Sequence, residues 1–409
     1  MSAYSSLLAT PGVARIIAAQ LLARFPNGML SLAFLLHIEQ VTGSYGAAGL
    51  VLAMTSIGQA IAGPLTSRWM GVWGMRRVIV LTLCVCVVSI TTIAIVDLRA
   101  LPLAVSVPLY MGLGLIAGLS TPPIQPAVRT IYPKLVNSRQ LTPLFSLDAS
   151  AQEIIWVLGP VITTFVSTQV GTIWGILLAV VFLILGGSWF VLSREVGRVR
   201  IPRSRRTLGA VLRRPPVLLA TVVGFLLVGA CAAIEAGVVA TFGHGGVEAG
   251  IVLAIFSVGS LAGGLALGHV PIGPWALARR MLIVFAGMAL AMLVLNVWWL
   301  SAFLLVAGIG IAPALAVIFA IVSASVKFSD TAEAYGWVGT GQLIGAALGS
   351  AIAGFLIDGN GPVGAFWAAA AIAFLGVVVP LIGKRWHPDL RGRDASPIPD
   401  TEPVPVQPS

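Results

Sequence analysis

Charged residues are scarce in this chain, and their scarcity excludes a water-soluble fold. Only 9% of the 409 residues are charged, whereas 58% are hydrophobic. A typical soluble domain has about 25% charged residues, because water must solvate its surface. We therefore predict an integral membrane protein that uses lipid as its solvent and has no separate soluble domain.

The chain also lacks the residue clusters that enzymes and metalloproteins use. Its three cysteines, Cys84, Cys86 and Cys231, all lie in apolar runs, and its four histidines are scattered. We therefore predict no disulfide, no metal site and no cofactor. A phosphate-binding loop of the form G-x-x-x-x-G-K-[ST] is absent, so ATP does not drive the protein directly. No convergent polar cluster supports an enzyme; an integral membrane enzyme or a non-transporting sensor is the alternative of another class.

Twelve apolar runs are long enough to cross a bilayer, which takes about 20 residues per helix. Runs of this length without alternation of polar and apolar residues are helices, because a helix satisfies its own backbone in lipid. We predict an all-α fold with twelve transmembrane helices. The runs lie at residues 13–36, 46–66, 78–96, 101–127, 142–168, 172–192, 217–241, 247–268, 278–297, 299–322, 335–357 and 363–383.

Basic residues gather on one side of this topology. If the N-terminus is cytoplasmic, 22 of the 24 lysines and arginines face the cytoplasm. The opposite loops hold Glu39, Asp97, Glu248 and Asp358, with Arg99 as their only base. By the positive-inside rule, both termini are predicted to be cytoplasmic in a multi-pass protein of the plasma (inner) membrane.

One arginine-rich connection divides the spans six and six. We expect this segment to be solvated and to touch anionic membrane lipids. Nucleic acid is not an expected partner, because no aromatic interleaving or binding fold accompanies the arginines. The predicted organisation is an N-terminal six-helix bundle at 1–192, a basic linker at 193–216, a C-terminal bundle at 217–385 and a disordered, proline-rich tail at 386–409.

The two halves of the chain repeat one another. Residues 48–58 align with 249–259 at an offset of 201, and residues 152–165 align with 342–355 at an offset of 190. Two matches in the same order indicate a duplication. We therefore predict two pseudo-symmetric bundles with a binding site near the membrane midplane between them.

Two charged residues lie deep in predicted spans. Arg24 and Glu153 are each about ten residues from the inner end of a span, which places both roughly 15 Å deep. Because an isolated charge there costs at least about 2.5 kcal/mol, we expect the two to meet. The pair is interpreted as proton- or substrate-responsive, and a fixed structural ion pair is the alternative. Six residues after Glu153, Gly159 and Pro160 are predicted to break the helix.

Other polar residues in the spans are weaker candidates. Glu235 lies toward the outer end of span 7, where it could serve coupling or simply line a wet cavity mouth. Gln125 and Gln342 are candidate hydrogen-bonding groups of the cavity, or else polar contacts between helices. Asp148 is only about six residues from the inner surface and is expected to be interfacial.

Several stretches resemble the major facilitator superfamily of secondary transporters. Residues 63–77 are similar to its glycine- and arginine-rich motif between spans 2 and 3, although Ser67 stands where an aspartate is usual. Gly159-Pro160 resembles the motif of proton-coupled exporters but lacks its full glycine set. Residues 122–129, followed by Asp148 and Glu153, resemble poorly characterised bacterial members. On the first motif, the gating candidates are Gly63, Arg68, Gly74, Arg76 and Arg77.

This resemblance implies a function. The chain is expected to move a small organic molecule by alternating access, as a monomer, with the proton as coupling ion and efflux as direction. An importer of a nutrient or metabolite is the alternative within the superfamily. The sequence does not define the substrate.

Overall fold

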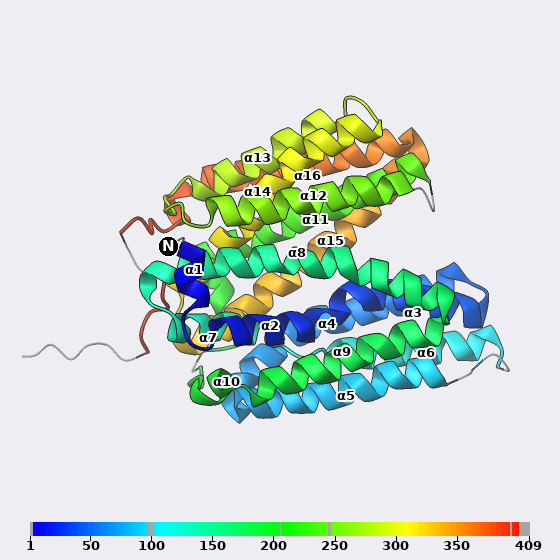
Figure 1. The fold of residues 1–409 in the computed structure, drawn as a ribbon, viewed down its shortest axis with the longest axis horizontal. Coiled ribbons are helices and arrows are strands. Elements are labelled where there is room, and N and C mark those ends of the chain that lie inside the picture. The colour runs from blue at the N-terminus through cyan, green and yellow to red at the C-terminus, as the bar shows by residue number, and fades with distance from the viewer. Residues whose placement is uncertain are drawn as a thin grey trace, which may run out of the picture.

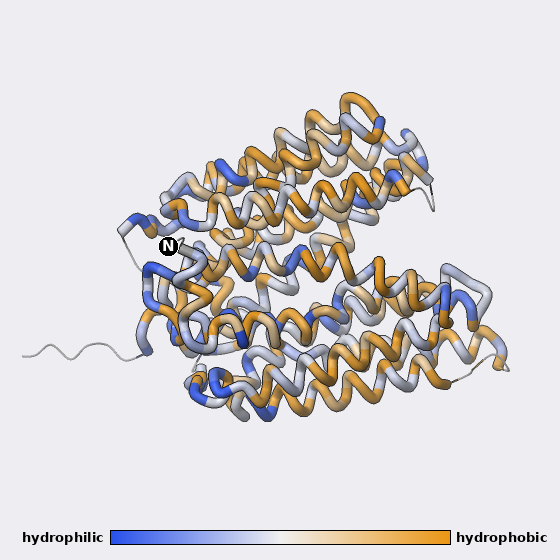
Figure 2. The backbone as a smooth tube through the Cα atoms, in the orientation of Figure 1, coloured by the Kyte–Doolittle hydropathy of each residue, from blue (hydrophilic) through white to orange (hydrophobic). Residues whose placement is uncertain are grey.

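The computed structural model describes residues 3–96, 98, 101–204, 206–243, 247–392 and 395–400. These residues form long helices that lie in two bundles (Figure 1). Hydrophobic residues run along the helices, and hydrophilic residues are concentrated at the two ends of the molecule (Figure 2). This is the pattern of a multi-pass membrane protein, and it confirms the predicted all-α class.

Within the described residues, nine α-helices precede the central connection and six follow it. The first set is α1 (Ala3–Leu8), α2 (Val13–Arg24), α3 (Pro26–Thr42), α4 (Tyr45–Trp73), α5 (Met75–Ile95), α6 (Leu103–Leu119), α7 (Ile124–Leu135), α8 (Ser138–Gln169) and α9 (Thr172–Leu192). The short α10 (Arg194–Arg198) opens the connection. The second set is α11 (Pro215–Phe242), α12 (Val247–Leu267), α13 (Ala276–Ala291), α14 (Val297–Ser325), α15 (Thr331–Asn360) and α16 (Pro362–Ile382).

Prolines interrupt two of the predicted spans. Pro26 separates α2 from α3, and Pro122 and Pro123 separate α6 from α7. Proline has no backbone N–H and cannot continue the hydrogen-bond ladder of the preceding turn. Each break therefore puts a helix end and its polar neighbours inside the membrane-spanning part of the N-terminal bundle.

The structure corrects the ninth predicted span. Eleven segments in the described residues are long and apolar enough to cross a membrane. The remaining helix, α13, has 16 residues and ends at Ala291, whereas the span was predicted to reach residue 297. Asn296 explains the difference, because its side chain accepts a hydrogen bond from Trp299 N at 2.8 Å and thereby begins α14.

The predicted break at Gly159-Pro160 was wrong. α8 continues through both residues and also contains Pro143. A proline removes one backbone hydrogen bond, and helices packed around it can hold the helix together. Thr163 Oγ1 donates to the Gly159 carbonyl at 2.8 Å and so supplies a further local hydrogen bond.

Gly159 serves close helix packing instead, and the duplication repeats this contact. A Cβ on Gly159 would lie 2.8 Å from the Gly28 carbonyl oxygen in α3. In the second half, a Cβ on Gly349 would lie 2.1 Å from the Gly229 carbonyl oxygen in α11. Gly159 and Gly349 differ by the predicted offset of 190, so α3 crosses α8 as α11 crosses α15.

We expect Gly349→Ala to lower the thermal stability of the purified protein. Overpacking of this kind costs about 1–3 kcal/mol, which exceeds the roughly 1 kcal/mol that alanine gains over glycine in a helix. Gly354→Ala on the same helix is the matched control, because no atom lies within 4 Å of its Cβ position. A melting temperature for Gly349→Ala at or above that of the control would contradict the close crossing.

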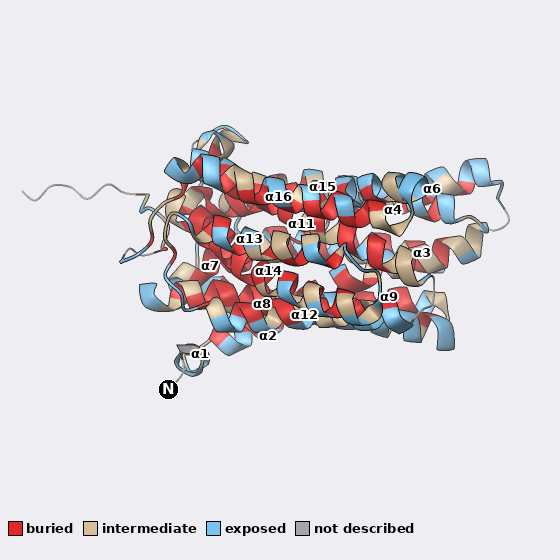
Figure 3. Ribbon diagram, turned by 90° about the horizontal axis from the view of Figure 1, so that it is seen from above, coloured by how far each residue is buried: buried red, intermediate tan, exposed pale blue. Residues whose placement is uncertain are grey.

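The two bundles touch mainly near one end of the molecule. They lie close together at the end that carries α1 and α10, here called the basic end, and they diverge toward the opposite end (Figure 1). Ser146 Oγ donates to the Gly264 carbonyl at 2.6 Å, and Thr340 Oγ1 donates to the Ala60 carbonyl at 2.7 Å. The burial of α14 supports this arrangement of the bundles. Residues 310–323, on the part of α14 that approaches the basic end, are all buried (Figure 3).

The linker and the C-terminal segment also pack at the basic end. Ile201 of the linker is buried, and Gly209 N donates to Glu333 Oε1 at 2.7 Å, so the linker is less solvated than expected. Ile398 N donates to the Val326 carbonyl at 2.9 Å. The tail was predicted to be disordered from residue 386, but Leu390 N and Ile398 N donate hydrogen bonds to the backbone of the C-terminal bundle. Backbone hydrogen bonds can hold a polar segment in place, because they do not depend on apolar side chains. Residues 401–409 lie outside the described part.

Candidate functional site

A buried carboxylate, Asp148, collects four donors inside the N-terminal bundle. It accepts hydrogen bonds from Arg129 Nε at 3.0 Å, Gln20 Nε2 at 3.1 Å, Tyr132 Oη at 3.2 Å and Arg24 at 3.3 Å. Asp148 is fully buried, and Arg24 and Arg129 are 4% and 1% exposed. We call these five residues the Asp148 cluster. Because buried charges require partners, the cluster explains how three charged groups are tolerated there.

This cluster overturns the predicted pair of Arg24 with Glu153. Arg24 pairs with Asp148, and Asp148 is buried rather than interfacial. Helix geometry gives the reason. At about 100° per residue, Glu153 points about 140° away from Asp148 around α8, so one arginine cannot face both.

Amide side chains complete the hydrogen bonding around the arginines. Gln152 accepts from Arg24 and from Arg129, the latter at 3.5 Å. Gln125 Oε1 accepts from Arg129 at 2.6 and 2.8 Å when its amide is oriented to match that donor. Gln20 and Arg24, Gln125 and Arg129, and Asp148 and Gln152 are each four residues apart, and therefore share a helix face. That repeated spacing is the sequence signal that could have identified the cluster.

Arg129 carries the cluster across to the other bundle. Its guanidinium carbon lies 3.4 Å from the ring centroid of Phe319 in α14. Phe145 of α8 lies 6.4 Å, centroid to centroid, from both Phe319 and Tyr335. A cation over an aromatic face is attractive, and more so where water is excluded. The cluster and these rings therefore help to close the bundle interface on its basic side.

Glu153 instead reaches across the bundle interface on its own. Ser260 Oγ of α12 donates to Glu153 Oε1 at 2.9 Å, and the same hydroxyl accepts from Ala312 N at 3.2 Å. Glu235 lies on α11 of the same C-terminal bundle, with an exposed side chain. Helices α8, α12 and α14, from both bundles, thus meet at the Ser260 hydroxyl.

Gln342 lies elsewhere, between two helices of the C-terminal bundle. A Cβ on Gly224 of α11 would be 3.5 Å from Gln342 Cγ. No hydrogen bond joins Gln342 to Glu153 in the described residues. Gln342 aligns with Gln152 in the duplication, but the two amides have different surroundings.

The glycine- and arginine-rich stretch is mostly helical, because α4 continues to Trp73. Gly63 contacts α15, where a Cβ on it would lie 3.0 Å from Thr340 Oγ1. Arg68 forms an ion pair of 3.2 Å with Glu333 of α15. Gly74 has φ of +89°, which suits glycine, and forms the turn into α5. Arg76 donates to the Ser193 carbonyl at 3.2 Å, and Arg77 is exposed.

We expect Arg68→Gln to lower transport, because this arginine links the two bundles at the basic end. Arg139→Gln is the matched control, since Arg139 is exposed at the start of α8 and lies outside the gating motif. The charge exchange Arg68→Glu with Glu333→Arg should restore part of the activity. Transport would be measured at equal amounts of protein in the membrane. Equal activity of both single variants would show that the arginines act only as orientation signals.

The chain belongs to the major facilitator superfamily. The family model matches residues 16–295 and 232–406. No curated protein sequence matches the chain significantly. Membership in a transporter family makes the protein a transporter rather than an enzyme and confirms the predicted resemblance.

Solved structures show the same fold at low identity. A bacterial homologue of the iron transporter ferroportin, in an outward-facing state, has a TM-score of 0.74 at 13% identity and covers 91% of this chain and 98% of its own. The proton:xylose symporter XylE, bound to 6-bromo-6-deoxy-D-glucose, has a TM-score of 0.69 at 16% identity. The match covers 96% of this chain and 98% of XylE. The human organic anion transporter MFSD10 has a TM-score of 0.68 at 16% identity, and the match covers 90% of this chain and 100% of that transporter.

Proposed function

We propose that the protein is a proton-coupled exporter of a small organic molecule, with Glu153 as the coupling carboxylate. The observation that carries this proposal is the hydrogen bond of 2.9 Å between Ser260 and Glu153, which joins α12 to α8 across the bundle interface. An ionisable residue inside a membrane bundle most often serves function, because its burial is costly.

Alternating access gives Glu153 two environments. In this structure three contacts join the bundles between the middle of the helices and the basic end: Ser260 with Glu153, Arg68 with Glu333, and Thr340 with the Ala60 carbonyl. Opening that end requires these contacts to separate. The environment of a carboxylate sets its proton affinity, so the same movement would change proton binding at Glu153. A change of this kind ties proton transfer to conformation, which is the requirement for coupling.

Efflux is proposed from the resemblance of Gly159-Pro160 to the exporter motif. Import is the second candidate, favoured by the fold shared with the proton:xylose symporter XylE. A screen of candidate compounds in inverted vesicles with an imposed pH gradient separates the two. Accumulation inside inverted vesicles that are acidic inside supports proton-driven export. Accumulation that needs the opposite gradient supports import with protons, and accumulation without any gradient contradicts coupling.

Orientation in the plasma membrane is the remaining part of the proposal. A reporter fused at Ser204 or after Pro399 is expected to face the cytoplasm, and one inserted near Gly246 to face outside. The basis is the 22 of 24 basic residues assigned to one side. A compartment-sensitive enzyme fusion measures this, and a cytoplasmic signal at Gly246 would overturn the topology.

A further inference from the structure

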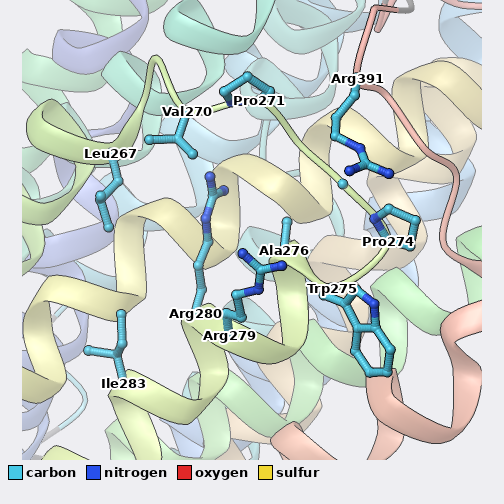
Figure 4. A pocket seen from close by; sticks show the side chains of 11 residues that line it. Leu267, Val270, Pro271, Pro274, Trp275, Ala276, Arg279, Arg280, Ile283 and Arg391 are labelled. Carbon is cyan, nitrogen blue, oxygen red and sulfur yellow. The ribbon is translucent and has the colours of Figure 1, made fainter.

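A cationic cavity opens at the basic end of the C-terminal bundle, away from the bundle interface. It has a volume of about 250 Å³ and lies between the α12–α13 loop, the start of α13 and the C-terminal segment. Figure 4 shows Arg279 and Arg280 of α13 and Arg391 of the C-terminal segment around it, with Trp275 at one side. Three guanidinium groups on one small cavity are unusual in a chain with so few charges.

The positive charge of this cavity is only partly neutralised. Arg391 pairs with Asp389 at 2.7 Å, and hydrogen bonds from Arg391 hold the pKa of that carboxyl at about 2, so it stays ionised. Arg280 donates to the Pro313 carbonyl at 2.7 Å, which leaves its charge uncompensated. Arg279 is exposed, and neither α13 arginine has an ion pair within the described residues. The cavity therefore suits an anion.

An apolar groove continues from the cavity between α13 and α16. Its volume is about 420 Å³, and it shares Trp275 and Arg279 with the cavity. Leu282, Val377 and Leu381 also line it. Lys384 lies 4.0 Å above the Trp275 ring and adds a cation where cavity and groove meet. A charged cavity that leads into an apolar groove matches a ligand with an anionic head and a hydrocarbon tail.

We propose that this place is a specific binding site for an anionic glycerophospholipid. Its phosphate would lie beside Arg279 and Lys384, and one acyl chain would lie in the groove between α13 and α16. Basic pockets on the cytoplasmic side of membrane helices bind anionic headgroups in this way, and tryptophan favours the same depth. The groove faces outward between two helices of one bundle, so a lipid can enter it laterally.

The test uses the full-length protein, purified in a neutral detergent and titrated with phosphatidylglycerol or phosphatidylcholine. Binding would be read by native mass spectrometry and by the shift in melting temperature. Wild type is expected to prefer phosphatidylglycerol. Arg279→Gln and Lys384→Gln should each weaken the binding of phosphatidylglycerol about fivefold, the equivalent of about 1 kcal/mol per basic residue.

Two controls make the result specific. Arg139→Gln with Arg213→Gln removes two exposed arginines elsewhere and should leave lipid affinity unchanged. Leu381→Gln places an amide in the groove. It should weaken the binding of the lipid and leave the binding of soluble glycerol phosphate unchanged. Equal affinity for the two lipids, or equal weakening by the control pair, would overturn the proposal. Glycerol phosphate binding as tightly as the lipid would assign the cavity to a free phosphate instead.

Discussion

Replacing Glu153 by glutamine is expected to abolish accumulation driven by a pH gradient while substrate binding and exchange without a gradient survive. Glutamine keeps the shape and can still accept the hydrogen bond from Ser260, but it cannot titrate. One pH unit coupled to one proton supplies about 1.4 kcal/mol, or about tenfold accumulation. The variant should show none of this gain in vesicles with a one-unit gradient.

A matched control separates coupling from a general loss of charge. Glu248→Gln removes an exposed carboxylate at the start of α12 and should accumulate substrate like wild type. If Glu153→Gln accumulates substrate as well as this control, Glu153 does not couple the proton. If Glu153→Gln cannot bind substrate at all, its role is in binding instead.

Asp148→Asn is expected to destabilise the protein severely. The change leaves Arg24 and Arg129 buried without their carboxylate, and breaking a buried ion pair in this way costs about 3–5 kcal/mol. Low expression and a lower melting temperature should follow. Glu153→Gln makes the corresponding acid-to-amide change one and a half turns later on α8 and should remain stable, because no ion pair involves Glu153 in the described residues.

A second substitution that restores the net charge of the Asp148 cluster should recover part of the stability lost in Asp148→Asn. Wild type holds two arginines and one carboxylate, a net charge of +1, and Asp148→Asn raises it to +2. Adding Arg24→Gln returns the cluster to +1, so the double variant should regain part of the melting temperature. A double variant less stable than Asp148→Asn alone would show that hydrogen bonding, rather than charge, determines stability here.

The fold could be predicted from the sequence because the length of an apolar run and the spacing of glycines are both visible in a single stretch of chain. Apolar runs mark helices wherever they lie, and the offset of 190 that relates Gly159 to Gly349 indicated the duplication. The close crossing at these glycines was not predicted, because Gly159 was expected to break its helix. The end of α13 was missed because Asn296 begins the next helix inside an apolar run. Span length alone does not indicate such a cap.

The partners of buried charges were harder to predict, because they depend on how each helix is rotated. Arg24 and Glu153 have similar depths, yet only Asp148 faces Arg24. Arg129 is one of the 22 basic residues that were predicted to face the cytoplasm, whereas α7 carries it into the bundle against Phe319. The contact of Glu153 with Ser260 joins residues 107 positions apart in different bundles, and no local pattern specifies it.

The most direct test of the account measures proton movement itself. Purified protein would be reconstituted into vesicles that contain a pH-sensitive dye, and a transported compound would be added without a pH gradient. Wild type is predicted to change the internal pH in proportion to the substrate moved, and Glu153→Gln to move substrate with no pH change. A pH change of the same size per substrate in both proteins would contradict the role of Glu153 in coupling.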